Sequence, residues 1–122
     1  MKKENIILQK TFDFSLSVIE MYKTLIYKKK EYVMSKQLLK AGTSVGANSN
    51  EAVVGQSKKD FVAKLSIARK EGYETKYWID LLRFSEYLTY DQTKRTYELL
   101  EECMKLICSS IKTSKESMEK KK

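Results

Sequence analysis

Apolar residues recur at helical spacing along almost the whole chain. Between about residues 6 and 29 they include Phe14, Val18 and Leu25, which share one face of an amphipathic helix. Three later segments carry similar apolar stripes, and the longest keeps a spacing close to seven residues. Such a repeat is typical of helices that pack side by side at a small crossing angle. The pattern predicts four helices, at roughly 6–29, 35–54, 58–88 and 91–114.

Short polar segments separate these helices and carry end signals. Ser35 and Asp91 are the expected N-caps of the second and fourth helices, and Gly55 is expected to end the second. Ser57 followed by Asp60 resembles a capping box at the start of the third. Because the loops are short, successive helices should be antiparallel neighbours. We expect an all-α fold, an antiparallel up-and-down four-helix bundle formed by one domain, 1–122, with a frayed tail at 115–122.

The composition favours helices and argues against catalysis. The chain has no Pro, four Gly and no His, so it lacks the commonest general base and metal ligand. Cys103 and Cys108 are five residues apart, which prevents a disulfide within a helix, and we expect buried thiols in a reducing compartment. The apolar run at residues 6–8 is too short for a signal peptide or a membrane span. We expect a cytoplasmic protein without enzymatic activity, metal, cofactor or membrane partner.

The second predicted helix contains an unusual charge-free segment, AGTSVGANSN, at residues 41–50. Gly42 and Gly46 lie one turn apart there, and each costs about 1 kcal/mol relative to Ala in a helix interior. A close approach to another helix would compensate, either across a subunit interface or at a tight crossing within the chain. Polar residues follow the same helix and form either a buried network or a solvated face. The candidate interface residues are Gln37, Lys40, Gly42, Ser44, Gly46, Asn48 and Glu51.

The net charge of +8 favours anionic partners. Clustered lysines suit a phosphate backbone, which is bound mainly through neutralised charge, although lysine-rich faces also serve solubility. Aromatic residues such as Tyr73, Tyr77 and Trp78 could stack on bases, but core or interface anchoring is the simpler interpretation. The candidate nucleic-acid-binding residues are Lys28, Lys29, Lys30, Lys58, Lys59, Lys64, Arg69 and Lys70.

Three segments carry a family resemblance: QLLKAGTSVGANSNEA at 37–52, QSKKDFVAKLSIARKE at 56–71 and ETKYWIDLL at 74–82. They resemble the bacterial four-helix-bundle proteins encoded in intervening sequences of large-subunit ribosomal RNA genes, often labelled as a ribosomal protein. This chain has Lys40 where many members have Arg, and Ser49 with Asn50 replace a more apolar and acidic pair.

The resemblance implies a short bundle that assembles into rings, commonly pentamers. A related protein is the accessory variability determinant of diversity-generating retroelements, a basic pentameric barrel that binds a reverse transcriptase and its RNA. We therefore expect a non-enzymatic homo-oligomeric scaffold that binds nucleic acid, most simply RNA. The alternative is an adaptor that docks a polymerase-type protein, such as a reverse transcriptase, without binding RNA or DNA itself.

Overall fold

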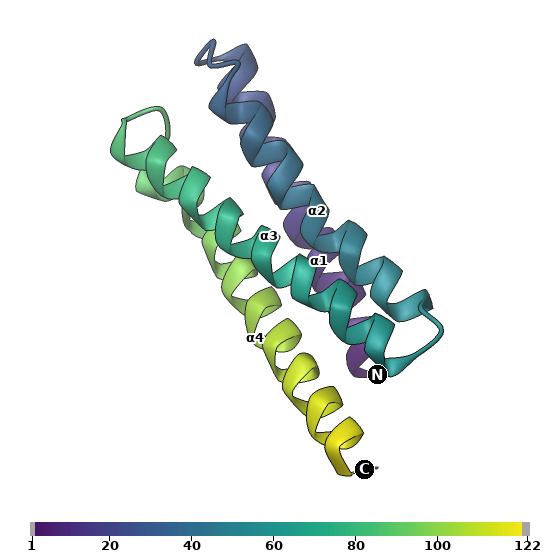
Figure 1. Cartoon of the computed structure of the whole chain (residues 1–122). Helices are drawn as coiled ribbons and strands as arrows, with labels where there is room; N and C mark the ends of the chain where they lie inside the picture. The colour runs from purple at the N-terminus through teal and green to yellow at the C-terminus, as the bar shows by residue number, and fades with distance from the viewer. Residues whose placement is uncertain (1, 121–122) are drawn as a thin grey trace.

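The computed structural model describes residues 2–120, which form four helices joined by short loops (Figure 1). The helices are α1 (Lys3–Tyr27), α2 (Met34–Val54), α3 (Lys58–Phe84) and α4 (Tyr90–Lys120). Each packs against the next, and α4 returns to pack against α1. Between α1 and α3, and between α2 and α4, no Cα atoms of the described residues approach within 8 Å. The chain is therefore the predicted antiparallel up-and-down bundle, with α1 and α3 at opposite corners.

The two ends of the bundle differ in what they contain. In Figure 1 the start of α1, the loop between α2 and α3 and the last turns of α4 lie at one end, called here the terminal end. The other two loops lie at the opposite end. Consequently α1 and α3 run in the same direction, away from the terminal end.

The predicted apolar stripes form the core. Leu38 of α2, Leu65 of α3 and Ile107 of α4 are fully buried, as is Phe14 of α1. Each such side chain contributes about 2 kcal/mol when it leaves water. The series predicted along α3 is buried throughout, except that its first member, Phe61, is half-buried. Its buried members are Leu65, Ala68, Gly72, Thr75, Ile79 and Leu82.

Glu31, in the loop before α2, caps that helix in place of the predicted N-cap Ser35. Its carboxylate accepts hydrogen bonds from the backbone N–H groups of Val33, Met34 and Ser35, the last at 2.8 Å. The Ser35 hydroxyl donates to the backbone carbonyl of Glu31 instead of capping. Glu31 is only 7% exposed. A buried carboxylate thus satisfies backbone donors that a helix leaves free at its first turn.

Of the other predicted helix caps, Ser57 and Gly55 are confirmed and Asp91 is wrong. Ser57 accepts from the backbone N–H of Asp60 and is the N-cap of α3. Gly55 is the C-cap of α2. Asp91 was the wrong N-cap for α4, because Thr89 accepts from the N–H of Gln92 while the Gln92 amide accepts from the N–H of Thr89. That reciprocal pair is a capping box with Gln at its third position.

Two helices end earlier than their periodicity predicts. Past the end of α1, Lys30 has φ 55°, and Glu86 has φ 70° just past the end of α3. Left-handed residues at these positions let backbone N–H groups reach back to the last carbonyls, as the N–H of Tyr87 does to Leu82. Neither residue is Gly, so the usual stop signal is missing from the sequence. α1 therefore ends at Tyr27 and α3 at Phe84, before the predicted 29 and 88.

The last helix is longer than predicted. α4 continues to Lys120 instead of ending near 114, so the expected fraying is wrong for residues 115–120, while 121–122 lie outside the described residues. Met118 packs against the core, and the Lys58 ammonium donates to the Ser117 hydroxyl. These contacts with the rest of the bundle hold turns that their own polar sequence would not stabilise.

The two glycines of α2 serve a tight crossing within the chain. A β-carbon at Gly42 would lie 2.7 Å from a methyl carbon of Val18 on α1. At Gly46 it would lie 3.2 Å from the Ser15 hydroxyl. Both glycines are buried against α1. They therefore serve a tight crossing within the chain, and their assignment to a subunit interface is wrong.

Glu31→Ala should lower the free energy of unfolding by about 2 kcal/mol, because several backbone N–H groups lose a charged acceptor. Urea unfolding followed by circular dichroism at one fixed protein concentration measures the effect. Glu20→Ala, at an exposed position of α1, is the control and should stay within about 0.5 kcal/mol of wild type. Equal effects of the two substitutions would contradict the capping role of Glu31.

Gly42→Ala should destabilise the chain by about 1–3 kcal/mol through overpacking against Val18, although Gly→Ala in an open helix is stabilising. Gly46→Ala should be close to neutral, since the Ser15 hydroxyl can rotate away. Adding Val18→Ala should relieve part of the Gly42→Ala defect, which a double-mutant cycle in urea detects. A stabilising Gly42→Ala would contradict the close crossing.

Candidate interaction surfaces

The described residues contain few groups suited to catalysis. No three His, Cys, Asp or Glu side chains among them are grouped as metal ligands. Cys103 is buried as predicted, and burial raises the pKa of its thiol to about 12, so it stays protonated at neutral pH. Cys108 is only half-buried, which corrects the prediction of two buried thiols. No helix in residues 2–120 is long and apolar enough to cross a membrane.

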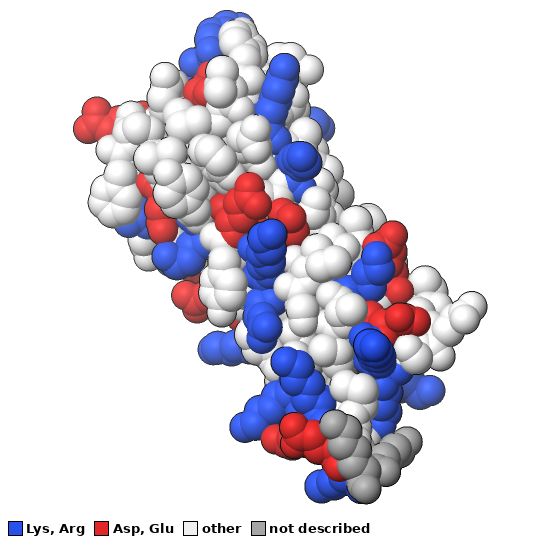
Figure 2. Space-filling model, in the orientation of Figure 1, with Lys and Arg blue, Asp and Glu red and all other residues white. Residues whose placement is uncertain are grey.

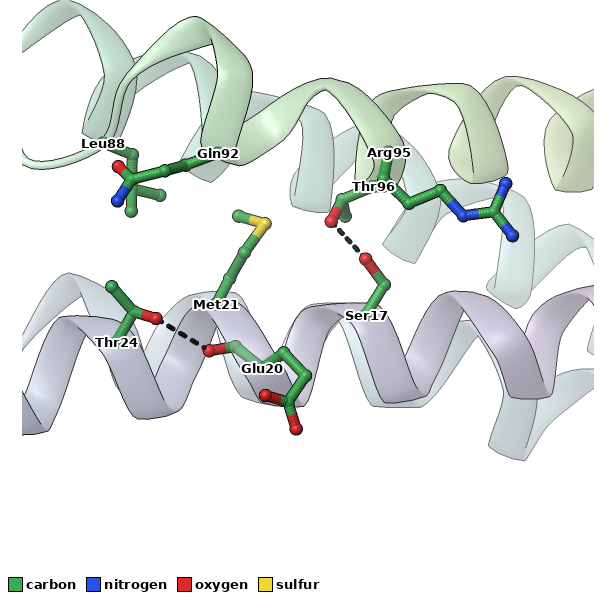
Figure 3. Close-up of a pocket in the computed structure, with 8 residues that line it drawn as sticks. All are labelled: Ser17, Glu20, Met21, Thr24, Leu88, Gln92, Arg95 and Thr96. Atoms are coloured by element: carbon green, nitrogen blue, oxygen red, sulfur yellow. Dashed lines mark hydrogen bonds between the residues drawn. The ribbon is translucent and has the colours of Figure 1, made fainter.

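A shallow pocket lies between α1 and α4 near the end opposite the termini (Figure 3). Met21 projects into it, and the hydroxyls of Ser17 and Thr96 are hydrogen-bonded to each other across it. Glu20 supplies the one carboxylate and Arg95 the one cation on its rim. The pocket therefore lacks the paired acid and base that hydrolytic chemistry needs.

The structure separates the lysines predicted to bind nucleic acid. Lys28–Lys30 lie in the loop after α1, whereas Lys58 and Lys59 begin α3 at the terminal end. Lys64 forms an ion pair with Glu51 of α2 at 3.2 Å. Arg69 and Lys70 lie midway along α3, half-buried and exposed respectively. The eight candidates therefore do not form one patch.

Lysines from three helices instead gather at the terminal end. The Lys3 ammonium donates to the Ser109 hydroxyl of α4 at 2.5 Å, and Lys58 donates to Ser117. Figure 2 shows most Lys and Arg residues of the visible face in the lower half of the view, with acidic residues among them. Sequence reasoning missed the lysines of α4 because it selected lysines by their clustering in sequence, and Lys112 and Lys115 stand apart from those clusters. The exposed lysines of this lysine-rich end are Lys2, Lys3, Lys58, Lys59, Lys112, Lys115 and Lys120.

A groove of about 310 Å³ between α3 and α4 holds a hydrogen-bonded polar cluster. The Lys76 ammonium lies 2.9 Å from the Asp80 carboxylate, and the Tyr97 hydroxyl donates to that same carboxylate. Burial alone would raise the pKa of Asp80, but hydrogen bonds from Tyr97 and Lys76 outweigh it and hold that pKa below its ordinary value. Burial and the Asp80 hydrogen bond raise the pKa of Tyr97. The cluster ties α3 to α4 and leaves no free base.

Large side chains remain exposed along the outer face of α3. Tyr73, Tyr77 and Phe84 are between 58% and 75% exposed, whereas Trp78 is half-buried and packs against the core. Tyr77 and Trp78, although adjacent in the sequence, therefore face different surroundings. An aromatic face without cover is uncommon on an isolated soluble domain.

The predicted polar stripe of α2 is not buried within the chain. Ser44 and Asn48 are half-buried and donate to the backbone carbonyls of Lys40 and Ser44, at 2.7 and 2.9 Å. Gln37 and Lys40 are exposed, and Glu51 pairs with Lys64 of α3. The stripe thus satisfies itself locally and leaves no unpartnered buried polar atom in the described chain.

An antiparallel four-helix bundle with a lysine-rich end and an exposed aromatic face defines a small, basic helical-bundle protein. The chain belongs to the family of 23S rRNA-intervening sequence proteins, whose family model matches residues 3–109. It is similar to a crystal structure from Bacteroides thetaiotaomicron VPI-5482, described as a protein of unknown function from the S23 ribosomal protein family. The two are 44% identical with a TM-score of 0.88, over 91% of this chain and 99% of that one. No curated protein matches, and neither description above names an enzymatic activity.

Tyr97→Phe should lower the free energy of unfolding by about 1 kcal/mol at neutral pH, because Asp80 loses a donor. The pKa of the Asp80 carboxyl is lower in the folded chain than in the unfolded chain. Ionised Asp80 therefore stabilises the fold at pH values above its unfolded pKa of about 4. This stabilisation is lost as the pH falls through the folded pKa. The variant should therefore lose less stability between pH 7 and about pH 3 than wild type does.

Urea unfolding at the two pH values measures this difference. Tyr32→Phe, in the exposed loop before α2, is the matched control and should follow wild type at both. An unchanged pH dependence in Tyr97→Phe would show that the phenol does not set the pKa of Asp80.

Proposed function

We propose that this chain is a non-enzymatic, homo-oligomeric scaffold of the cytoplasm that binds RNA through the lysine-rich end of each bundle. The observation that carries the proposal is the meeting of lysines from α1, α3 and α4 at that end. Phosphate backbones are bound mainly by such grouped positive charge, without base-specific contacts.

Local structure supports this choice of surface. The hydrogen bonds from Lys3 and Lys58 to serines of α4 hold two ammonium groups against that helix, which itself carries Lys112 and Lys115. α1 and α3 begin at this end while α2 and α4 end there, so the helix dipoles largely cancel and the positive potential comes from the lysine side chains. Glu4, Asp60 and Glu116 are interspersed among the lysines, which limits affinity and makes binding sensitive to salt.

RNA is favoured over the other partners considered. The lysine-rich end offers grouped positive charge to a phosphate backbone, and nothing in it distinguishes bases, as a DNA operator would require. An adaptor for a polymerase-type protein would need no lysine-rich end at all. Non-specific binding to single-stranded or structured RNA is the chemistry that this surface fits.

Replacing Lys58, Lys59, Lys112 and Lys115 together with Gln should weaken RNA binding at least tenfold at about 50 mM salt, because each lysine that neutralises a phosphate releases counterions. Fluorescence anisotropy with a labelled single-stranded RNA measures binding. The slope of log affinity against log salt should also become shallower, by about 0.7 for each phosphate that the variant no longer neutralises.

The matched control places the same charge change at the opposite end, as Lys28→Gln, Lys29→Gln, Lys30→Gln and Lys36→Gln, and should stay within about twofold of wild type. Equal losses of RNA affinity in both variants would show that the terminal end is not the binding surface. Wild-type chain without detectable RNA binding at about 50 mM salt would refute the RNA-binding function.

A further inference from the structure

A hollow opens at the lysine-rich end, where the first turns of α1 and α3 meet α4. Two adjoining cavities of about 150 and 300 Å³ form it, and they share Glu4, Phe61 and Ser114 on their walls. The smaller cavity lies between these three helices, and the larger reaches the loop between α2 and α3 at Gly55. Cavities of this size hold small organic ligands in other proteins. The hollow therefore has room for one nucleotide of a bound strand.

Hydroxyl groups of α4 line the smaller cavity. Ser110, Thr113 and Ser114 share one face of that helix because they are three and four residues apart. Ser110 is only 6% exposed, yet its hydroxyl has no hydrogen-bond partner among residues 2–120. Every side-chain oxygen or nitrogen of the described chain that is sealed from solvent does have one. The Ser110 hydroxyl therefore opens into the hollow, where it is free to bind a ligand.

Two lysines of the hollow retain unused hydrogen-bond donors. Lys3 lines the smaller cavity and Lys58 lines the larger. Each ammonium donates to one serine of α4, although an ammonium has three donors. These bonds hold both charges against α4 at the edge of the hollow. A phosphate group there would accept charge-assisted hydrogen bonds, which are stronger than neutral ones.

Glu4 and Phe61 add chemistry that a phosphate alone would not use. Phe61 is half-buried against the core and lines both cavities, so it offers an aromatic wall on which a base can stack. The Glu4 carboxylate forms no ion pair within residues 2–120. It repels phosphate, but it can accept a hydrogen bond from the 2′-hydroxyl of a ribose, which RNA has and DNA lacks.

We propose that this hollow holds one unpaired ribonucleotide of a bound RNA. The base lies against Phe61, and the ribose 2′-hydroxyl donates to Glu4. The phosphate lies between the Lys3 ammonium and the Ser110 hydroxyl. This inference rests on the RNA binding of the proposed function and gives the lysine-rich end a means of preferring RNA to DNA, because it recognises the sugar and not the base.

The test compares a labelled single-stranded RNA with the DNA of the same sequence, carrying deoxyuridine for thymidine, by fluorescence anisotropy at about 50 mM salt. Wild type should bind the RNA about tenfold more tightly, because the DNA leaves Glu4 without a donor. Glu4→Ala should bring the ratio of the two affinities close to one. It should also strengthen DNA binding, since a repelling carboxylate is lost.

Glu116→Ala is the matched control, because it removes the same charge from the same end at an exposed position that lines neither cavity. It should raise the affinity for RNA and DNA equally and keep the wild-type ratio. Phe61→Leu should weaken RNA binding about fivefold through lost stacking, whereas Phe84→Leu, at the far end of α3, should stay within about twofold of wild type. Circular dichroism confirms that each variant is helical.

Equal affinity of wild type for RNA and DNA, or an unchanged preference in Glu4→Ala, would overturn this inference and leave the RNA-binding function standing. Full competition by about 10 µM adenosine 5′-monophosphate would assign the hollow to a free nucleotide and would also overturn it, since a lone phosphate releases few counterions. A wild type that binds no RNA would overturn both proposals, so the two failures are distinguishable.

Discussion

The close crossing of α1 and α2 at Gly42 constrains the rest of the bundle. With no side chain at Gly42, α2 packs directly on Val18, and Val45, Gly46 and Ser49 of the same segment are buried. The crossing also fixes the outward direction of α1, since the side of α1 that meets α2 is set by Val18 and Thr11.

Periodicity predicted the core because burial depends on residues three and four positions apart, and that signal is strong in all four helices. Helix ends depend on single hydrogen bonds, and here the sequence was less informative. Lys30 and Glu86 adopt left-handed backbone without being Gly, and Glu31 caps α2 from outside the helix. The length of α4 depends on tertiary contacts of Met118 and Ser117, which no local pattern records.

The candidate surfaces were only partly predictable for a related reason. Lysines were identified by their clustering in sequence, yet the bundle separates Lys28–Lys30 from Lys58 and brings Lys58 beside α4 instead. The charge-free segment of α2 correctly signalled close packing, but its glycines face α1. The uncovered apolar surface lies on both α1 and α3, whose large apolar residues exceed what one buried stripe requires. That excess was visible in the sequence, but only the structure shows which residues point outward.

The homo-oligomer and the RNA surface of the proposed function are geometrically compatible. The lysine-rich end lies at the tip of the bundle, so contacts between the sides of neighbouring bundles leave it uncovered. A closed ring repeats one rotation, which keeps every bundle pointing the same way along the ring axis. If the bundles pack side by side in a ring whose axis follows the helices, all lysine-rich ends meet on one rim. Each end alone is diluted by acidic neighbours, but a rim of several would present the extended positive surface that a phosphate backbone follows.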